Sequence, residues 1–200
     1  MKNEYFIIES LPKDDIHDGK IFYDALKSSG IYEPIYKVVT SATEFETALK
    51  IFETSGCKFL FISAHGDEEN ITLIDGDYNA YDLADLDLHL PGRRVFLSTC
   101  RGGSFIFARY FIKKGVYSVI GSPDDLSQIV ATAIWTTMAI LFERLNSGGI
   151  KYEELNTTMK VLSDVYGIDL AYFSFIRDKP KMKRYFYSSG LERIKEVYNL

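Results

Sequence analysis

Two uninterrupted apolar segments limit the fold of this chain more than any other feature. Lys58–Ala64 (KFLFISA) and Arg94–Thr99 (RVFLST) show no alternation of apolar and polar residues. A strand with one face in water alternates, whereas a strand of a parallel sheet is covered by helices on both faces and reads as a continuous apolar run. Both segments therefore predict central strands of a mostly parallel sheet.

The rest of the chain alternates between strand and helix patterns. For example, Ser41 and Glu44 have the spacing of a capping box, and a helix with apolar residues at helical spacing follows them. The expected strands are Glu4–Glu9, Ile35–Val39, Lys58–Ala64, Ile71–Ile74, Arg94–Thr99, Tyr117–Gly121, Ala171–Ile176 and Arg184–Tyr187. The expected helices are Asp18–Ser29, residues 41–55, Tyr81–Leu90, Ser104–Lys114, Ser127–Leu145 and Tyr152–Tyr166. This order predicts an α/β fold, a single three-layer α/β/α domain over residues 1–200.

Charge and composition exclude several classes of protein. The net charge of −5 gives no general attraction to nucleic acid or to an anionic membrane. The sequence contains no apolar run long enough to cross a bilayer and starts without a signal-peptide pattern. Two cysteines in 200 residues do not form a disulfide framework, so we expect a cytoplasmic protein with reduced thiols.

Aromatic and basic residues gather near the C-terminus. Tyr185, Phe186 and Tyr187 follow Lys183 and Arg184, a combination that resembles a strip on which nucleic-acid bases stack. The acidic chain as a whole favours a different interpretation, a late edge strand with a basic face. Such an edge can pair with the same edge of a second copy, so a homodimer is a candidate.

His65 and Cys100 each follow one of the two central strands, and glycines come just after them. Parallel strands end at the same edge of a sheet, and open α/β sheets bind their ligands at that edge. A thiol and an imidazole meeting there are the parts of a cysteine nucleophile and its acid–base partner. The backbone N–H groups of Gly66 and Cys100 are candidates for holding a developing oxyanion.

Each of these residues also has a structural interpretation. A lone cysteine at a strand end is usually a small buried apolar group, and we expect this for Cys57. A lone histidine is more often a satisfied polar group than a catalyst, and we expect this for His17 and His89. The pairing of His65 and Cys100 on neighbouring strands favours the catalytic interpretation for those two alone.

Other chemistries lack their motifs. The sequence has no phosphate-binding glycine loop, no G-x-S-x-G turn and no cysteine–histidine spacing that suits zinc. The Asp75-Gly76-Asp77 segment lacks the remaining ligands of a calcium loop and predicts a turn. We therefore expect neither a metal nor any other cofactor.

The ordered set of motifs resembles the caspase-like superfamily of cysteine peptidases, and within it the bacterial CHAT branch. The shared pattern is a strand ending in His65-Gly66, then a strand ending in Cys100 with glycine beyond. The segments ITLIDGDYNAYDLADLDLHLPGRRVFLSTCRGG and VYSVIGSPDDLSQIVATAIWTTMAILFERLNSGG also resemble CHAT sequences. The likeness extends over about residues 59–162.

The resemblance implies cleavage of peptide bonds through a thioester, with Cys100 as nucleophile, His65 as acid and base, and Gly66 and Cys100 as the oxyanion hole. It also implies a protein or peptide substrate and a charged group that selects the P1 residue. Candidate substrate-binding residues are Asp67, Arg101, Asp124 and Asp125, and the aspartates favour a basic P1 residue. An equally good interpretation of Asp124 and Asp125 is capping of the helix Ser127–Leu145.

The sequence also departs from the resemblance. Thr99 precedes the cysteine where many relatives have a small or acidic residue, and the tryptophan that many CHAT sequences carry near the acidic loop is replaced by Ser122-Pro123. Trp135 lies inside the following helix and is expected in the core. No fused repeat or sensor domain is present, so we expect control by a partner chain, by processing or by dimerisation.

Three functions follow from these observations. The first is a cysteine endopeptidase with a Cys100–His65 dyad. The second is an inactive interaction module on the same fold, because a fold alone does not give a function. The third is another thiol hydrolase or transferase on a flavodoxin-like sheet.

Overall fold

A computed structural model describes residues 1–145, 152–175 and 182–188. The strands are β1 (Tyr5–Ser10), β2 (Ile35–Val38), β3 (Phe59–Gly66), β4 (Asn70–Leu73), β5 (Gly76–Asn79), β6 (Arg94–Ser98), β7 (Ser118–Gly121), β8 (Leu170–Phe175) and β9 (Met182–Tyr187). The helices are α1 (Asp18–Ser28), α2 (Ala42–Thr54), α3 (Ala80–Asp85), α4 (Phe105–Lys113), α5 (Gln128–Leu145) and α6 (Tyr152–Tyr166). Among the described residues, no helix is both long and apolar enough to cross a membrane.

The sheet is mixed but mostly parallel. Its order is β2-β1-β3-β6-β7-β8-β9, and the strands from β2 to β7 run parallel. The last two strands, β8 and β9, are antiparallel, while the β4–β5 hairpin branches from the end of β3. The predicted α/β fold with a mostly parallel sheet is therefore confirmed, and the antiparallel edge is an addition to it.

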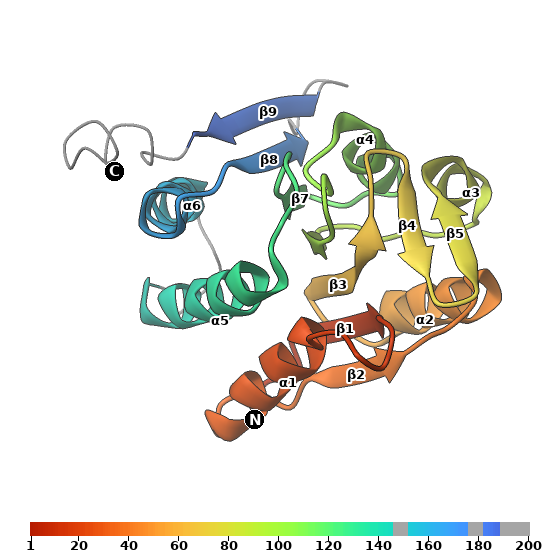
Figure 1. Cartoon of the computed structure of the whole chain (residues 1–200), viewed down its shortest axis with the longest axis horizontal. Coiled ribbons are helices and arrows are strands. Elements are labelled where there is room, and N and C mark those ends of the chain that lie inside the picture. The colour runs from red at the N-terminus through yellow and green to blue at the C-terminus, as the bar shows by residue number, and fades with distance from the viewer. Residues whose placement is uncertain (146–151, 176–181, 189–200) are drawn as a thin grey trace.

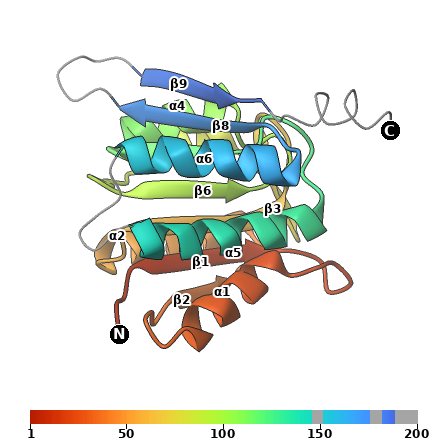
Figure 2. The ribbon, with the colours of Figure 1, turned by 90° about the vertical axis from the view of Figure 1, so that its left-hand side faces the viewer.

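Helices cover both faces of this sheet, which explains the continuous apolar runs. On one side lie α1, α5 and α6, and on the other α2, α3 and α4 (Figures 1 and 2). Along β3, Leu60 and Ile62 contribute to the core on the α2 side, and Phe59 and Phe61 to the core on the α1 and α5 side. Every position of β3 up to Ala64 is therefore buried.

The helix predicted over Tyr81–Leu90 is wrong in its second half. Helix α3 begins at the capping box of Asn79 and Asp82 and ends at Asp85. Leu86, Leu88 and Leu90 then enter the core at every second position. A spacing of two places side chains on one face of an extended segment but not of a helix. The alternation in DLDLHL was therefore the signal that the helix stops.

The turn after Cys100 lies directly against the end of β7. A Cβ atom built on Gly103 would lie 2.7 Å from the carbonyl oxygen of Gly121, and one on Gly121 would lie 2.7 Å from the amide nitrogen of Gly103. The two backbones approach so closely that neither position has room for a side chain. This contact fixes where the loop after Cys100 sits.

We expect Gly121→Ala to lower the free energy of unfolding by about 3 kcal/mol, because the new methyl group would collide with backbone atoms that cannot rotate away. The control is Gly30→Ala, where φ is +70° but nothing lies within 4 Å of the added carbon. It should cost only about 1 kcal/mol. Urea unfolding of both variants measures the difference, and equal losses would contradict the close approach.

Candidate active site

The register of two central strands brings His65 and Cys100 to the same edge of the sheet. Ser63 and Ser98 form the last residue pair between β3 and β6, and His65 and Cys100 each lie two residues further along. Neighbouring strands are about 4.8 Å apart, so the two chain segments lie side by side at this edge. The register thus places His65 and Cys100 at the same edge of the sheet, and the pairing of their side chains as a dyad stays a prediction.

His65 contacts a carboxylate that sequence reasoning did not identify. Its Nε2 atom lies 2.6 Å from Oδ2 of Asp15, and the His65 side chain is 46% exposed. Asp15 lies in the loop after β1, and Ser10, the last residue of β1, pairs with Ala64 of β3. Because β1 and β3 end together, their following residues meet at one edge.

Cys100 lies in a tight turn between β6 and α4 and is half-buried. Its Sγ atom lies 3.9 Å from the carbonyl oxygen of Leu126. In the part of the chain that the structure describes, no hydrogen bond joins His65 and Cys100, and the backbone N–H of Cys100 donates none. Helix α4 begins only at Phe105, so a short turn separates Cys100 from the helix expected to favour its thiolate.

Gly66 and Asp67 shape the turn that follows His65. A Cβ atom on Gly66 would lie 2.6 Å from the carbonyl oxygen of Asn70, so only glycine fits there. The Asp67 carboxylate accepts hydrogen bonds from the backbone N–H groups of Glu69 and Asn70 and from the Asn70 side chain. Burial alone would raise the pKa of Asp67, but these hydrogen bonds outweigh it and lower the pKa. Its carboxylate is thus engaged within its own turn.

Arg101, Asp124 and Asp125 lie together beside Cys100. The Nε atom of Arg101 lies 3.1 Å from Oδ1 of Asp125, and the Arg101 backbone N–H donates to the carbonyl oxygen of Asp124. Arg101 has a φ of +55°, in the left-handed region. Helix α5 begins at Gln128, and the Ala131 N–H donates to the carbonyl oxygen of Ser127. The Asp125 carboxylate forms an ion pair with Arg101. Among the described residues, it accepts no hydrogen bond from the first turn of α5.

A buried carboxylate lies beneath the two strand ends. Asp18, at the start of α1, accepts hydrogen bonds from the hydroxyls of Ser63 and Ser98, and the second of these is 2.5 Å long. Trp135 of α5 donates from Nε1 to the Ser98 hydroxyl over 2.8 Å. Asp18 is 4% exposed. Burial raises its pKa, although the two serine hydrogen bonds act in the opposite direction.

The sequence contained a signal for this buried group. Ser63 and Ser98 are polar positions near the ends of mostly apolar strands, two residues before His65 and Cys100. A buried hydroxyl requires a partner, so two of them at one edge indicate a further polar residue nearby. Cys57 and Trp135 are both buried, as the sequence predicted.

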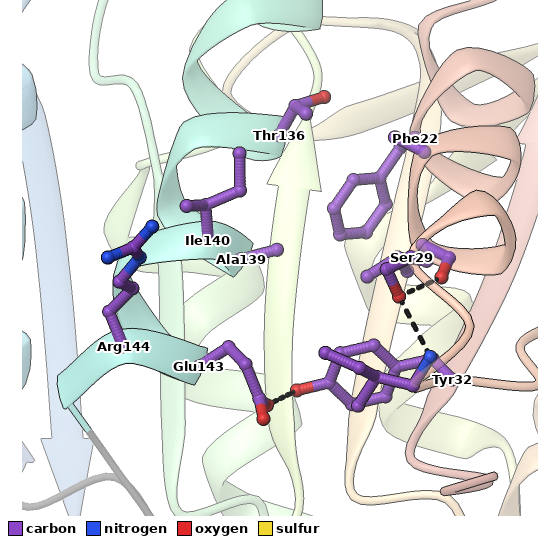
Figure 3. A pocket seen from close by; sticks show the side chains of 11 residues that line it. Phe22, Ser29, Tyr32, Thr136, Ala139, Ile140, Glu143 and Arg144 are labelled. Atoms are coloured by element: carbon purple, nitrogen blue, oxygen red, sulfur yellow. Dashed lines mark hydrogen bonds between the residues drawn. The ribbon is translucent and has the colours of Figure 1, made fainter.

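Among the described residues, no group of three or more His, Cys, Asp or Glu side chains could hold a metal ion. A separate cavity of about 320 Å³ opens between α1 and α5 (Figure 3). It lies near the C-terminal halves of these helices, where Tyr32 donates a hydrogen bond to Glu143. His65 and Cys100 do not line this cavity.

Comparisons with solved structures identify the fold. The chain is similar to the crystal structure of the Arg-specific cysteine proteinase gingipain R, with a TM-score of 0.56 and 13% identity over 80% of this chain and 41% of that one. This likeness shows a caspase-like fold. The complex of the pro- and mature domains of RgpB from Porphyromonas gingivalis matches similarly, with a TM-score of 0.54 and 14% identity over 80% of this chain and 42% of that one.

The chain spans about two fifths of each of these two structures. No protein-family model matches the chain, and no curated protein matches it in sequence. At 13% and 14% identity the comparison establishes the fold, while the chemistry rests on the residues themselves.

The buried Asp18 makes stability depend on pH. Because its pKa in the folded chain lies above the ordinary 3.8, the folded state binds the proton more tightly. The resulting stabilisation is present below about pH 4 and is lost as the pH rises through the folded-state pKa. We expect the free energy of unfolding of the wild type, minus that of Asp18→Asn, to fall as the pH rises above about 4.

Urea unfolding at a series of pH values measures this difference. Asp24→Asn is the control, because it removes a carboxylate from the same helix at a position whose side chain is 56% exposed. A difference between wild type and Asp18→Asn that does not change with pH would contradict the role of burial.

Proposed function

We propose that this chain is a cysteine peptidase with Cys100 as nucleophile and His65 as general acid and base. The observation that carries the proposal is the register of β3 and β6, which brings an imidazole and a thiol to one sheet edge. The caspase-like fold supports it, because the matched structures are those of a cysteine proteinase. Membership of the CHAT branch is part of this proposal and rests on the sequence motifs.

The chemistry follows from the groups at that edge. The Cys100 thiolate attacks the carbonyl carbon of the scissile bond, and its electron pair becomes the new C–S bond. The N–H groups of Gly66 and Cys100 hold the oxyanion. Imidazolium at His65 gives a proton to the departing amine, which leaves a thioester. His65 then takes a proton from water, the hydroxide attacks the thioester, and the Cys100 thiolate is released.

Asp15 orients His65 for these proton transfers. An ionised carboxylate only accepts hydrogen bonds, so Nε2 of His65 carries the hydrogen toward Asp15. The remaining nitrogen, Nδ1, is then the one that exchanges protons with substrate and water. A buttressing acceptor of this kind fixes the tautomer and stabilises the imidazolium when it forms. Asp15 is therefore a positioning residue.

Asp18 is the group we propose for a basic P1 preference. It lies between Ser63 and Ser98, each two residues before a proposed catalytic residue. Glu9, fully buried, lies beside it through the shared Ser63 hydroxyl. A guanidinium or ammonium group reaching Asp18 would supply the countercharge that the two hydroxyls cannot, which favours basic side chains over neutral ones.

The proposed partners are a protein or peptide substrate and a regulatory chain, in a cytoplasmic setting. One matched structure is a complex of the pro- and mature domains of a proteinase, which is consistent with regulation by a separate segment in proteins of this fold. The β9 strand is the last of the described sheet and supplies the edge for a homodimer.

A non-catalytic interaction module is the second candidate. The observation in its favour is that His65 contacts Asp15 and Cys100 contacts the Leu126 carbonyl, so the two side chains share no hydrogen bond among the described residues. In structures without substrate, catalytic hydrogen bonds are often long, so this geometry is compatible with both candidates. Peptide cleavage by the wild type separates them.

Cys100→Ala should abolish cleavage of a fluorogenic peptide library, and His65→Ala should lower kcat by about 100-fold or more, since positioned acid–base groups contribute at least this much. Circular dichroism checks that both variants remain folded. Cleavage that survives Cys100→Ala would exclude Cys100 as nucleophile.

Asp15→Asn should lower kcat by about tenfold or more with little change in KM, because the amide disturbs the His65 tautomer while the binding surface remains. Asp14→Asn is the matched control, since it removes an adjacent exposed carboxylate that makes no contact with His65 among the described residues. Equal effects of the two variants would indicate a general loss of charge.

Among library peptides, those with Arg or Lys at P1 should have the highest kcat/KM. Asp18→Asn should reduce this preference by about 100-fold, as expected for leaving a buried cation without its partner, and should spare peptides with a neutral P1 residue. A preference that survives the substitution would assign the P1 selectivity to another residue.

A further inference from the structure

The segment between β7 and α5 crosses the sheet edge directly beside Cys100. We call residues 122–126 the strap. The Gly103 N–H donates to the carbonyl oxygen of Ser122 over 2.7 Å, and the Arg101 N–H donates to that of Asp124 over 3.0 Å. At the far end, Oε1 of Gln128 accepts a 3.4 Å hydrogen bond from the N–H of Ile16, in the loop before α1. The strap and the start of α5 together therefore join the Cys100 turn to the loop that carries Asp15.

Arg101 makes two of the four hydrogen bonds between the Cys100 turn and the strap. Arg101, directly after Cys100, donates its backbone N–H to Asp124 and its side-chain Nε to Asp125. Its φ of +55° is a conformation that costs free energy for a residue other than glycine. The two contacts offset that cost, so the closed strap and the unusual backbone at Arg101 stabilise one another.

The strap ends in a carbonyl group that accepts a long hydrogen bond from the thiol. The Leu126 oxygen lies 3.9 Å from Sγ of Cys100, while the Leu126 side chain is buried in the core that contains Trp135. A thiol can donate to a carbonyl oxygen and a thiolate cannot, so this contact suits the less nucleophilic form.

The structure combines a strap that contacts the Cys100 turn with an Asp18 side chain that is buried. Asp18 and Ser98 are 4% and 6% exposed, and Trp135 of the helix that follows the strap bonds to Ser98. A P1 side chain cannot reach Asp18 in this arrangement. In this structure Cys100 contacts the Leu126 carbonyl, and Asp18 contacts two serine hydroxyls. Both groups are therefore occupied by neighbours within the chain.

We propose that the Arg101–Asp125 ion pair is a latch that holds the strap closed over Cys100 and keeps the site at rest. The inference rests on the proposed function for the role of Cys100, but the latch itself concerns access to the thiol. Both side chains are well exposed, at 49% and 73%, so a competing charge from solvent, substrate or partner can break the pair. Opening the strap then frees the sulfur from the Leu126 carbonyl.

The test measures the rate of Cys100 alkylation by iodoacetamide, followed by mass spectrometry, in a Cys57→Ser background with one thiol. Asp125→Asn and Arg101→Gln should each raise the rate about two- to fivefold, the range that corresponds to an exposed ion pair. Asp124→Asn is the matched control: it removes the same charge one residue away, leaves the pair intact, and should react at the parent rate. The double exchange Arg101→Asp with Asp125→Arg should restore slow alkylation.

Salt provides a second readout. Raising NaCl from about 0.1 M to about 1 M should speed alkylation of the parent but not of Asp125→Asn, because screening weakens only an ion pair that exists. Asp125→Asn reacting at the parent rate would overturn the latch, as would equal acceleration by Asp124→Asn. Since alkylation needs no substrate, failure of the latch and failure of the peptidase proposal are separate results: absence of cleavage by every variant overturns only the latter.

Discussion

The hydrogen bonds of the buried Glu9 carboxylate to the start of α1 fix the sheet edge at which His65 and Cys100 lie. The carboxylate is fully buried near the end of β1 and accepts hydrogen bonds from the backbone N–H groups of Gly19 and Lys20, in the first turn of α1. A helix N-terminus favours an anion, and a buried anion needs donors. The free N–H groups of α1 and the Glu9 carboxylate therefore satisfy one another. Tyr36, Ser63 and His17 supply the remaining contacts.

This one contact positions much of the candidate site. Because the start of α1 is held against β1 and β3, the loop before it must cross the sheet edge near His65, which brings Asp15 within 2.6 Å of the imidazole. The same anchoring places Asp18 under Ser63 and Ser98. The absence of a side chain at Gly19 matters here, since a Cβ atom would lie 2.9 Å from the Glu9 carboxylate.

How much of this could be predicted from the sequence depends on the range of the interactions. The continuous apolar runs before His65 and Cys100 predicted adjacent parallel strands, because burial on both faces leaves a local pattern. Asp15 and Asp18 left no such pattern, since their partners are 45 to 80 residues away and depend on how loops fold over the edge. The pairing of Arg101 with Asp125 was missed for the same reason. Ile176, the last residue of the expected strand Ala171–Ile176, lies outside the described residues.

The position of Trp135 gives the molecule an internal optical reporter. It is the only tryptophan of the chain, is 1% exposed, and packs edge-on against Phe61 and Phe96. Its indole N–H donates a hydrogen bond to the Ser98 hydroxyl, which in turn donates to Asp18. Indole emission depends on local polarity and hydrogen bonding. Any event that admits water or charge between the two strand ends should therefore change the fluorescence of the unlabelled protein, without a probe attached near Cys100.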